Sequence, residues 1–271
     1  MKTAFAYPAL DEEAHLRRTV ERTLHMMDRL VIIDDGSTDR TGEIATELAR
    51  EHPDKIDVIH HPENVGVGSA VKSAFRLLLA RGDMDAIGVI PGGDPCEPDL
   101  VRQFREVLET TPEVDVAKGS RFMHAPSRHE MPALRRWRDR GASTALQLAL
   151  GFWGMDDVLH GYFLARTDLM RQMDLDAVAD GYDLEQTMMV EFRRLRATFA
   201  LVPSPSDEGA HRRKPPHTLA AVSSMVARRA VQGPDRLGLA LLLMSVPTFG
   251  ASLPFALLRI KRTSPKVTKL R

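Results

Sequence analysis

Strand-like and helix-like segments alternate four times over the first part of this chain, and this alternation constrains the fold more than any other feature. Short apolar runs are each followed by a longer stretch whose apolar residues recur at helical spacing. The expected strands are residues 3–7, 30–33, 56–59 and 86–90, and the expected helices are residues 11–27, 38–51, 67–79 and 98–109. The pattern predicts an α/β fold with a mostly parallel sheet and helices on both faces.

Each of these four strands ends in polar or turn-forming residues, at 8–9, 34–37, 60–64 and 91–94. In open parallel sheets, ligands bind at the carboxyl ends of the strands. The four segments are therefore candidates for a binding edge. Further strands at 114–118, 159–165 and 198–202, with helices at 135–150 and 184–196, complete one domain over residues 1–210.

The segment IDDGSTD at residues 33–39 is the strongest local signal. Helix capping accounts for its Ser-Thr-Asp part, but it does not account for two adjacent acids, Asp34 and Asp35, at the end of an apolar strand. The pair therefore indicates a functional position. The neighbouring His60 and His61 are not expected to share a metal ion, because adjacent strand residues point to opposite faces.

The last 61 residues differ from the rest in charge and hydropathy. Residues 211–271 hold 12 Lys or Arg and a single acid, which leaves the first 210 residues with a net charge of −11. Residues 237–258 form an uncharged run of 22 residues between Arg236 and Arg259. This length can cross a membrane, but two short helices on the membrane face, or packing within a soluble assembly, also fit. A re-entrant or interfacial hairpin suits the basic cluster beyond residue 258 best.

The other bulk features limit the compartment and the partners. With one cysteine, Cys96, no disulfide framework is possible, and we expect no signal peptide, because residues 1–10 run directly into a polar segment. We expect a cytoplasmic body, attached to the cytoplasmic face of the membrane through residues 237–258. An acidic body with a basic tail argues against a nucleic-acid module.

Six short motifs, taken in order, resemble those of the family 2 glycosyltransferases with the GT-A fold, and most closely the polyprenyl-phosphate (dolichol-phosphate-mannose-type) sugar transferases. They are YPALDEE at 7–13, IDDGSTD at 33–39, NVGVGSA at 64–70, GSRF at 119–122, DVLHGY at 157–162 and GYDLE at 181–185. The resemblance covers about residues 3–205 and implies a GT-A sheet with a nucleotide-sugar donor over its carboxyl edge.

The resemblance also implies roles for individual residues. Arg121 would reach the acceptor or the diphosphate, and Asp35 would accept a hydrogen bond from the base. Asp183 or Glu185 would serve as a base for a hydroxyl acceptor. The residues expected to bind the nucleotide are Pro8, Ala9, Glu12, Asp35, Ser37, Asn64, Gly66, Gly68 and Lys72.

The sequence departs from the family at the metal-binding D-x-D motif, which belongs at the end of the fourth strand. In VIPGGDPCEP, at residues 89–98, the two aspartate positions fall on Pro91 and Gly93, and Asp94 occupies the next position. Mg²⁺ or Mn²⁺ bridging a diphosphate takes only one or two carboxylates, so Asp94 is the predicted metal ligand and a catalytic candidate. A contribution from His211 or His217, beside the basic run at 212–214, is an alternative to a plain basic linker.

Three functions follow from these features. The first is transfer of a sugar from a nucleotide-sugar to a polyprenyl phosphate, an acceptor whose anionic oxygen needs no strong base. The second is a GT-A-fold transferase with another acceptor or with metal-free chemistry. The third is a non-catalytic protein that binds the nucleotide-sugar without turning it over.

Overall fold

The computed structural model describes residues 1–90, 98–123, 154–205 and 266–269, together with residues 137, 140, 141, 143, 144 and 147. Within these residues the expected α/β fold is confirmed. A single sheet has the strand order β3-β2-β1-β4-β6-β5-β7-β8. All neighbouring strands are parallel except β6, which runs antiparallel to both β4 and β5.

The first half of the chain follows the predicted alternation. It contains β1 (Thr3–Ala9), α1 (Leu16–Thr23), a 3-10 turn (Leu24–Met26), β2 (Arg29–Asp35), α2 (Thr41–Glu51), β3 (Ile56–His61), α3 (Val67–Arg81) and β4 (Ala86–Val89). The apolar residues that recur at helical spacing in the expected first helix, Leu16, Val20, Leu24 and Met27, are all buried, the last two just beyond the end of α1.

The second half supplies the remaining strands and helices. They are α4 (Pro98–Thr110), β5 (Val116–Ser120), β6 (Phe163–Arg166), α7 (Thr167–Met170), a 3-10 turn (Leu175–Ala177), α8 (Leu184–Arg194), β7 (Phe199–Pro203) and β8 (Val267–Lys269). The strand β8 was not expected. It brings three residues of the C-terminal segment to the edge of the sheet, where Val267 pairs with Phe199. The domain boundary at residue 210 stays a prediction.

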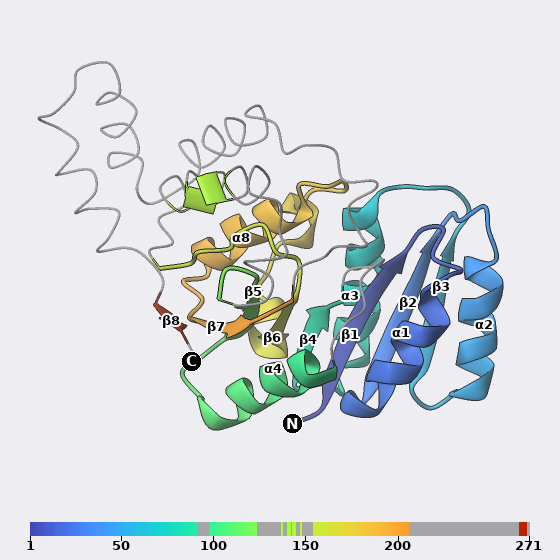
Figure 1. The fold of residues 1–271 in the computed structure, drawn as a ribbon, viewed down its shortest axis with the longest axis horizontal. Helices are drawn as coiled ribbons and strands as arrows, with labels where there is room; N and C mark the ends of the chain where they lie inside the picture. Colours follow the sequence, from blue (N-terminus) through green and yellow to red (C-terminus); the bar gives the residue numbers. More distant parts are fainter. Residues whose placement is uncertain are drawn as a thin grey trace, which may run out of the picture.

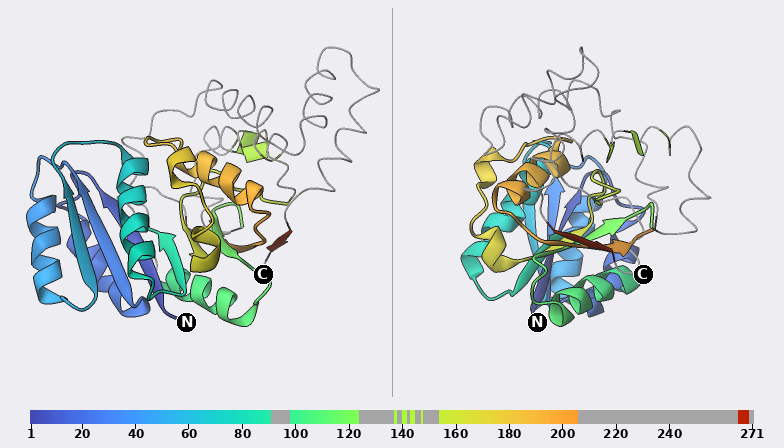
Figure 2. Two further views of the ribbon diagram at one scale, coloured as in Figure 1. Left: turned by 180° about the vertical axis from the view of Figure 1, so that it is seen from behind. Right: turned by 90° about the vertical axis from the view of Figure 1, so that its left-hand side faces the viewer.

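The sheet separates two apolar cores. On one face, alternate residues of β1 and β2 pack with α3 and α8, and on the other face the intervening residues pack with α1, α2 and α4. Figure 1 and the reversed view in Figure 2 show α1 and α3 on opposite sides of the sheet. This alternation follows from the two-residue period of a strand.

Two helices begin later than the sequence indicated. The first helix begins at Leu16 instead of residue 11, and the second at Thr41 instead of residue 38. In both cases the polar residues before the helix lie in a loop, and the loops after β1 and β2 hydrogen-bond to each other, as described below. Of the described residues, no helix combines the length and apolar character needed to cross a membrane. Residues 237–258 lie outside the described part.

Candidate active site

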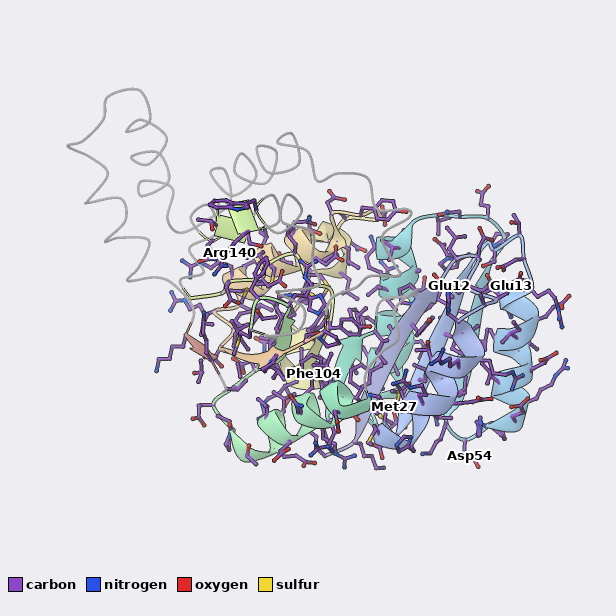
Figure 3. All side chains as sticks on the ribbon, viewed as in Figure 1. Glu12, Glu13, Met27, Asp54, Phe104 and Arg140 are labelled. Carbon is purple, nitrogen blue, oxygen red and sulfur yellow. The ribbon has the colours of Figure 1, made fainter. Side chains whose placement is uncertain are left out.

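A cavity of about 500 Å³ lies at the carboxyl end of the sheet. One end of the cavity is lined by the loops after β1, β2 and β3. The other end is lined by β5, the approach to β6 and helix α8. Seven of the predicted site residues contribute to its walls: Pro8, Ala9, Glu12, Asp35, Asn64, Gly66 and Glu185. Figure 3 shows Glu12 and Glu13 toward this end of the sheet and Met27 and Asp54 toward the opposite end.

The loops after β1 and β2 are joined by reciprocal hydrogen bonds. The backbone N–H of Asp11 donates to Oγ of Ser37 over 3.1 Å, and the N–H of Thr38 donates to Oδ1 of Asp11 over 2.8 Å. The N–H of Glu12 donates to Oγ1 of Thr41. Asp11 adopts a positive φ of 50°, which turns the chain sharply at the end of β1. Ser37, predicted to bind nucleotide, does not line the cavity; its hydroxyl instead holds the loop after β1, which does.

The adjacent acids Asp34 and Asp35 each have a histidine partner on β3. The parallel register sets Asp34 beside His60 and Asp35 beside His61. Nδ1 of His60 lies 3.0 Å from Oδ2 of Asp34, and Nδ1 of His61 lies 2.7 Å from Oδ1 of Asp35. Because a carboxylate only accepts, each Nδ1 carries the hydrogen.

Each histidine continues to a hydroxyl group on a helix. Nε2 of His60 contacts Oγ1 of Thr46 on α2, whereas Nε2 of His61 contacts Oγ of Ser73 on α3. The two Asp–His–hydroxyl chains therefore lie on opposite faces of the sheet, as the alternation of strand residues predicted. They account for an acidic pair at the end of an apolar strand.

Asp35 is the member of the pair that lines the cavity, and it is 4% exposed. Besides His61, its carboxylate accepts the N–H groups of Val65 (3.2 Å) and Gly66 (3.0 Å). A carboxylate has about four acceptor positions, so these three bonds leave room for one more donor from a ligand. Asp35 thereby ties the loop after β3 to the end of β2 and faces the cavity with a fixed orientation.

Gly68 and Lys72 lie against another part of the chain. The N–H of Gly68 donates to the carbonyl of Asp180 over 2.8 Å, and a Cβ at Gly68 would overlap the carbonyl oxygen of Ala179. The ammonium of the buried Lys72 binds the carbonyl of Val178 and the carboxylate of Asp180. Hydrogen bonds from Lys72 and Ser69 lower the pKa of Asp180. Neither Gly68 nor Lys72 lines the cavity, and both attach the loop before α8 to the start of α3.

Arg121 forms a buried bidentate ion pair with Asp157. Its Nε and Nη2 each donate to the carboxylate over 2.8 Å, and its backbone N–H donates over 2.9 Å. Burial alone would raise the pKa of Asp157, but the charge and hydrogen bonds of Arg121, with His160 and Lys118, lower it to about 2. The pair joins two of the sequence motifs, since Arg121 belongs to GSRF and Asp157 to DVLHGY. Arg121 does not line the cavity, so its predicted contact with acceptor or diphosphate stays a prediction.

Lys118 on β5 is a cavity residue that the sequence analysis missed. It is 3% exposed, and its ammonium donates to the carbonyl of His160. Burial lowers the pKa of Lys118 to about 8, although the charges of Asp157 and Glu185 oppose the shift. His160 also lines the cavity, and its Nε2 lies 2.7 Å from Oγ of Ser204.

Glu185 and Asp183, the predicted base candidates, begin helix α8. Glu185 lines the cavity and is partly buried, whereas Asp183 is the N-cap residue and does not line it. The apolar residues Leu184, Met188, Met189 and Phe192 of the same helix also line the cavity. The helix thus presents one carboxylate and a broad apolar surface to the same space.

The predicted metal ligand lies outside the described residues. Asp94, with Pro91, Gly93 and Cys96, falls in the segment 91–97, and His211 and His217 fall in 206–265. Over the part of the chain that the structure does describe, no group of three or more His, Cys, Asp or Glu residues could hold a metal ion. The prediction of Mg²⁺ or Mn²⁺ on Asp94 therefore stays a prediction.

A family model, glycosyl transferase family 2, matches residues 5–174, which is more than half of the chain. The chain belongs to this family. It is therefore an enzyme of the glycosyltransferase class, as the six motifs predicted.

Two curated relatives of this family 2 glycosyltransferase have named activities. The polyprenol monophosphomannose synthase of Mycolicibacterium smegmatis is 28% identical over 207 residues, covering 75% of this chain and 76% of that protein. The undecaprenyl-phosphate mannosyltransferase of Micrococcus luteus is 29% identical over 175 residues, covering 64% and 70%.

Solved structures support the fold. The glucosyl-3-phosphoglycerate synthase of Mycobacterium tuberculosis bound to UDP superimposes with a TM-score of 0.61 at 22% identity, over 83% of this chain and 80% of that one. The same enzyme with Mn²⁺, UDP and glucosyl-3-phosphoglycerate gives a TM-score of 0.57 at 24% identity, over 85% of this chain and 77% of that one. At these identities the likeness establishes the GT-A-like fold of the family 2 enzyme.

Proposed function

We propose that this family 2 glycosyltransferase moves a sugar from a nucleoside diphosphate donor to a lipid-phosphate acceptor of the polyprenyl type, with inversion at the sugar carbon. The observation that supports this proposal is one cavity with two unlike ends. The end at β1–β3 is formed by polar loops, and the end at β5 and α8 combines apolar side chains with Lys118 and Glu185. The relatives that act on polyprenol and undecaprenyl phosphate support the same acceptor class.

The polar end suits a nucleoside. Asp35 is fixed by three hydrogen bonds and retains acceptor capacity toward the cavity, which fits an N–H group of a base. Pro8, Ala9 and Glu12 from the loop after β1 lie on the same wall. The loop hydrogen bonds fix this wall before a ligand arrives, which reduces the ordering cost of binding.

The apolar end suits the acceptor. Phe163, Met188, Met189 and Phe192 give a surface on which a hydrocarbon chain can lie. In the proposed reaction an anionic phosphate oxygen forms a bond to the sugar carbon, and the bond from that carbon to the nucleoside diphosphate breaks. No proton need be removed from the acceptor, so Glu185 is not required as a base.

The membrane attachment also stays a proposal. Residues 206–265 connect β7 to β8, which are neighbouring strands of one sheet. A single crossing by residues 237–258 would place these strands on opposite sides of the membrane, so we favour an interfacial or re-entrant hairpin on the cytoplasmic face. Flotation with anionic vesicles tests this idea, and equal flotation of Leu242→Asp and the unaltered protein would contradict it.

The direct test is a transfer assay with purified full-length protein. UDP- and GDP-sugars are each paired with a polyprenyl phosphate and, separately, with a hydroxyl acceptor, with and without EDTA. Transfer to the polyprenyl phosphate supports the proposal. Transfer only to the hydroxyl acceptor favours a transferase with a different acceptor. Transfer that persists in EDTA indicates metal-free chemistry. Nucleotide binding without turnover favours a non-catalytic protein.

A further inference from the structure

Lys118 combines burial with unfilled hydrogen-bonding capacity. A lysine ammonium has three N–H donors, and among the described residues Lys118 has one acceptor, the carbonyl oxygen of His160. No carboxylate of the described residues lies within ion-pair distance of it, although Asp156, Asp157 and Glu185 act on it through their charges. An ammonium taken out of water without such partners is costly.

Two other buried cationic side chains near the site, unlike Lys118, form ion pairs with carboxylates of the protein. Lys72 binds both a carbonyl and the carboxylate of Asp180, and Arg121 binds Asp157 in a bidentate pair. Both hold protein segments together and neither lines the cavity. Lys118 does line it, and within the described residues no acceptor besides the carbonyl of His160 takes its N–H groups.

The surroundings of Lys118 indicate what kind of anion it takes. In the sheet it pairs with Phe163 on one side and Leu201 on the other, and paired residues project to the same face. Phe163, Met188 and Met189 line the same end of the cavity. Glu185 is the charged residue beside Lys118 at this end of the described lining. A cation in a wall that is otherwise largely apolar fits a phosphate monoester that carries a hydrocarbon chain better than it fits a free polar phosphate.

The position in the sheet separates Lys118 from the nucleoside end. The strand order places β4 and β6 between β1 and β5, so Lys118 is three strand spacings, about 14 Å, from the strand that ends at Pro8 and Ala9. The donor base at β1–β3 and an anion at Lys118 can therefore occupy the cavity together.

We propose that Lys118, rather than Arg121, binds the phosphate of the acceptor. This inference rests on the proposed function for the identity of the reaction, but its phosphate site can be tested without turnover. Lys118 makes no covalent bond and transfers no proton in the reaction, and it holds the attacking phosphate group in place by charge-assisted hydrogen bonds.

The test compares Lys118→Met with the unaltered full-length protein and with Lys55→Met, which alters an exposed lysine in the turn before β3. Binding of octyl phosphate, 1-octanol, inorganic phosphate and UDP or GDP is measured by calorimetry. We expect Lys118→Met to lower the affinity for octyl phosphate about tenfold or more, with the affinities for 1-octanol and the nucleotides unchanged. Lys55→Met should match the unaltered protein throughout.

A second readout needs no variant. Anion binding at Lys118 raises the pKa of its ammonium, so octyl phosphate binding at pH 8.5 should take up protons. Comparing the heats in two buffers of different ionisation enthalpy measures this uptake, which should disappear in Lys118→Met. A Lys118 with a structural role alone would give no such difference between the two proteins.

Several results would overturn the inference. Equal octyl phosphate affinity in Lys118→Met, or a loss of nucleotide affinity instead, would remove Lys118 from the acceptor site. If inorganic phosphate bound as tightly as octyl phosphate, the hydrocarbon chain would contribute nothing to binding at this site. If Lys118→Met transfers sugar to polyprenyl phosphate at full kcat/KM, the inference fails and the function stands. If no lipid phosphate is glycosylated but octyl phosphate binding needs Lys118, the function fails and the site stands.

Discussion

The two ends of the cavity handle buried charge in opposite ways. At the β2–β3 end, Asp34 and Asp35 each have a histidine, and the histidines have hydroxyl partners. At the β5–α8 end, Arg121 and Asp157 form a buried pair that does not line the cavity, while Lys118 has one backbone acceptor among the described residues.

This difference shows how each end can meet its ligand. A base is neutral, and it is read by an acceptor that is already fixed, so a carboxylate such as Asp35, held by three hydrogen bonds with one acceptor position left, favours recognition. A phosphate brings its own charge, and a cation that is fully paired within the protein would have to break those bonds to bind it. An incompletely paired Lys118 lowers the stability of the free enzyme, and an anionic ligand removes that cost.

The largest expected effect comes from breaking the ion pair at the β5 end. Arg121→Ala leaves the carboxylate of Asp157 buried without its guanidinium partner, with the backbone N–H of residue 121 still donating to it, and should lower the free energy of unfolding by about 3–5 kcal/mol. Urea unfolding at pH 7 measures it. The control is Arg40→Ala, which breaks the exposed pair with Glu43 and should change stability far less, because water screens that pair. Similar losses in the two variants would contradict a buried, dry pair.

The same pair predicts an acid dependence. The pKa of Asp157 is lowered from 3.8 to about 2 in the folded protein, so its contribution to stability is present above pH 4 and is lost as the pH falls toward 2. The contribution is about 2 kcal/mol. Asp157→Asn should lack this part of the acid dependence, and an unchanged pH profile would show that the ion pair is not formed in solution.

Stability should also rise with pH where Lys118 titrates, but here the charged form destabilises the folded protein, whereas the charged form of Asp157 stabilises it. The pKa of Lys118 is lowered from 10.5 to about 8, so the folded state binds fewer protons than the unfolded state between these values and stability rises with pH across them. Below pH 8, charging Lys118 costs about 3 kcal/mol. We therefore expect Lys118→Met to be more stable than the unaltered protein at pH 7, with the difference shrinking toward pH 10.

Unfolding at pH 7, 8.5 and 10 measures this difference. Lys55→Met, at an exposed position, should follow the unaltered protein at every pH. A Lys118→Met variant that is less stable at pH 7 would mean that the ammonium is fully paired in the free enzyme, and the contrast between the two ends would be lost.

At the other end, Asp35→Ala should lower nucleotide affinity about tenfold or more, because the ligand loses a charged acceptor and the loop at 65–66 loses its attachment. Titration with UDP and GDP measures it. Asp54→Ala, at the opposite end of the sheet (Figure 3), is the control and should bind as the unaltered protein does. Unchanged nucleotide affinity in Asp35→Ala would mean that the nucleoside does not bind at the end of β2.

The sequence predicted the sheet well because its information is local. Apolar runs, polar strand ends and helical spacing each depend on a few neighbouring residues, and together they place Asp35 and Asn64 at one edge. Glu185 was predicted only through the resemblance of its motif to the family. Lys118 was missed because its burial depends on β6, β7 and α8, which follow it by more than 40 residues. In sequence it is a lysine at the end of a strand, a position where most lysines reach solvent.

The same limit explains the placements of Arg121 and Lys72. A motif indicates that an arginine or lysine matters, but it does not say whether the charge meets a ligand or another part of the chain. Arg121 meets Asp157 at a separation of 36 residues, and Lys72 meets Val178 at a separation of 106. Those pairings are set by the packing of distant segments.

The smallest expected effects compare the two histidines. The side chain of His61 is 13% exposed and that of His60 is 47% exposed. His61→Ala should therefore cost about 2 kcal/mol of stability and weaken nucleotide binding, because it removes a partner of the buried Asp35. His60→Ala should cost less than about 1 kcal/mol, because water can replace the ring at Asp34. Unfolding and nucleotide titration of both variants measure the difference. Equal effects of the two substitutions would mean that both Asp–His–hydroxyl chains only stabilise the sheet. His61 would then have no added role in nucleotide binding through Asp35.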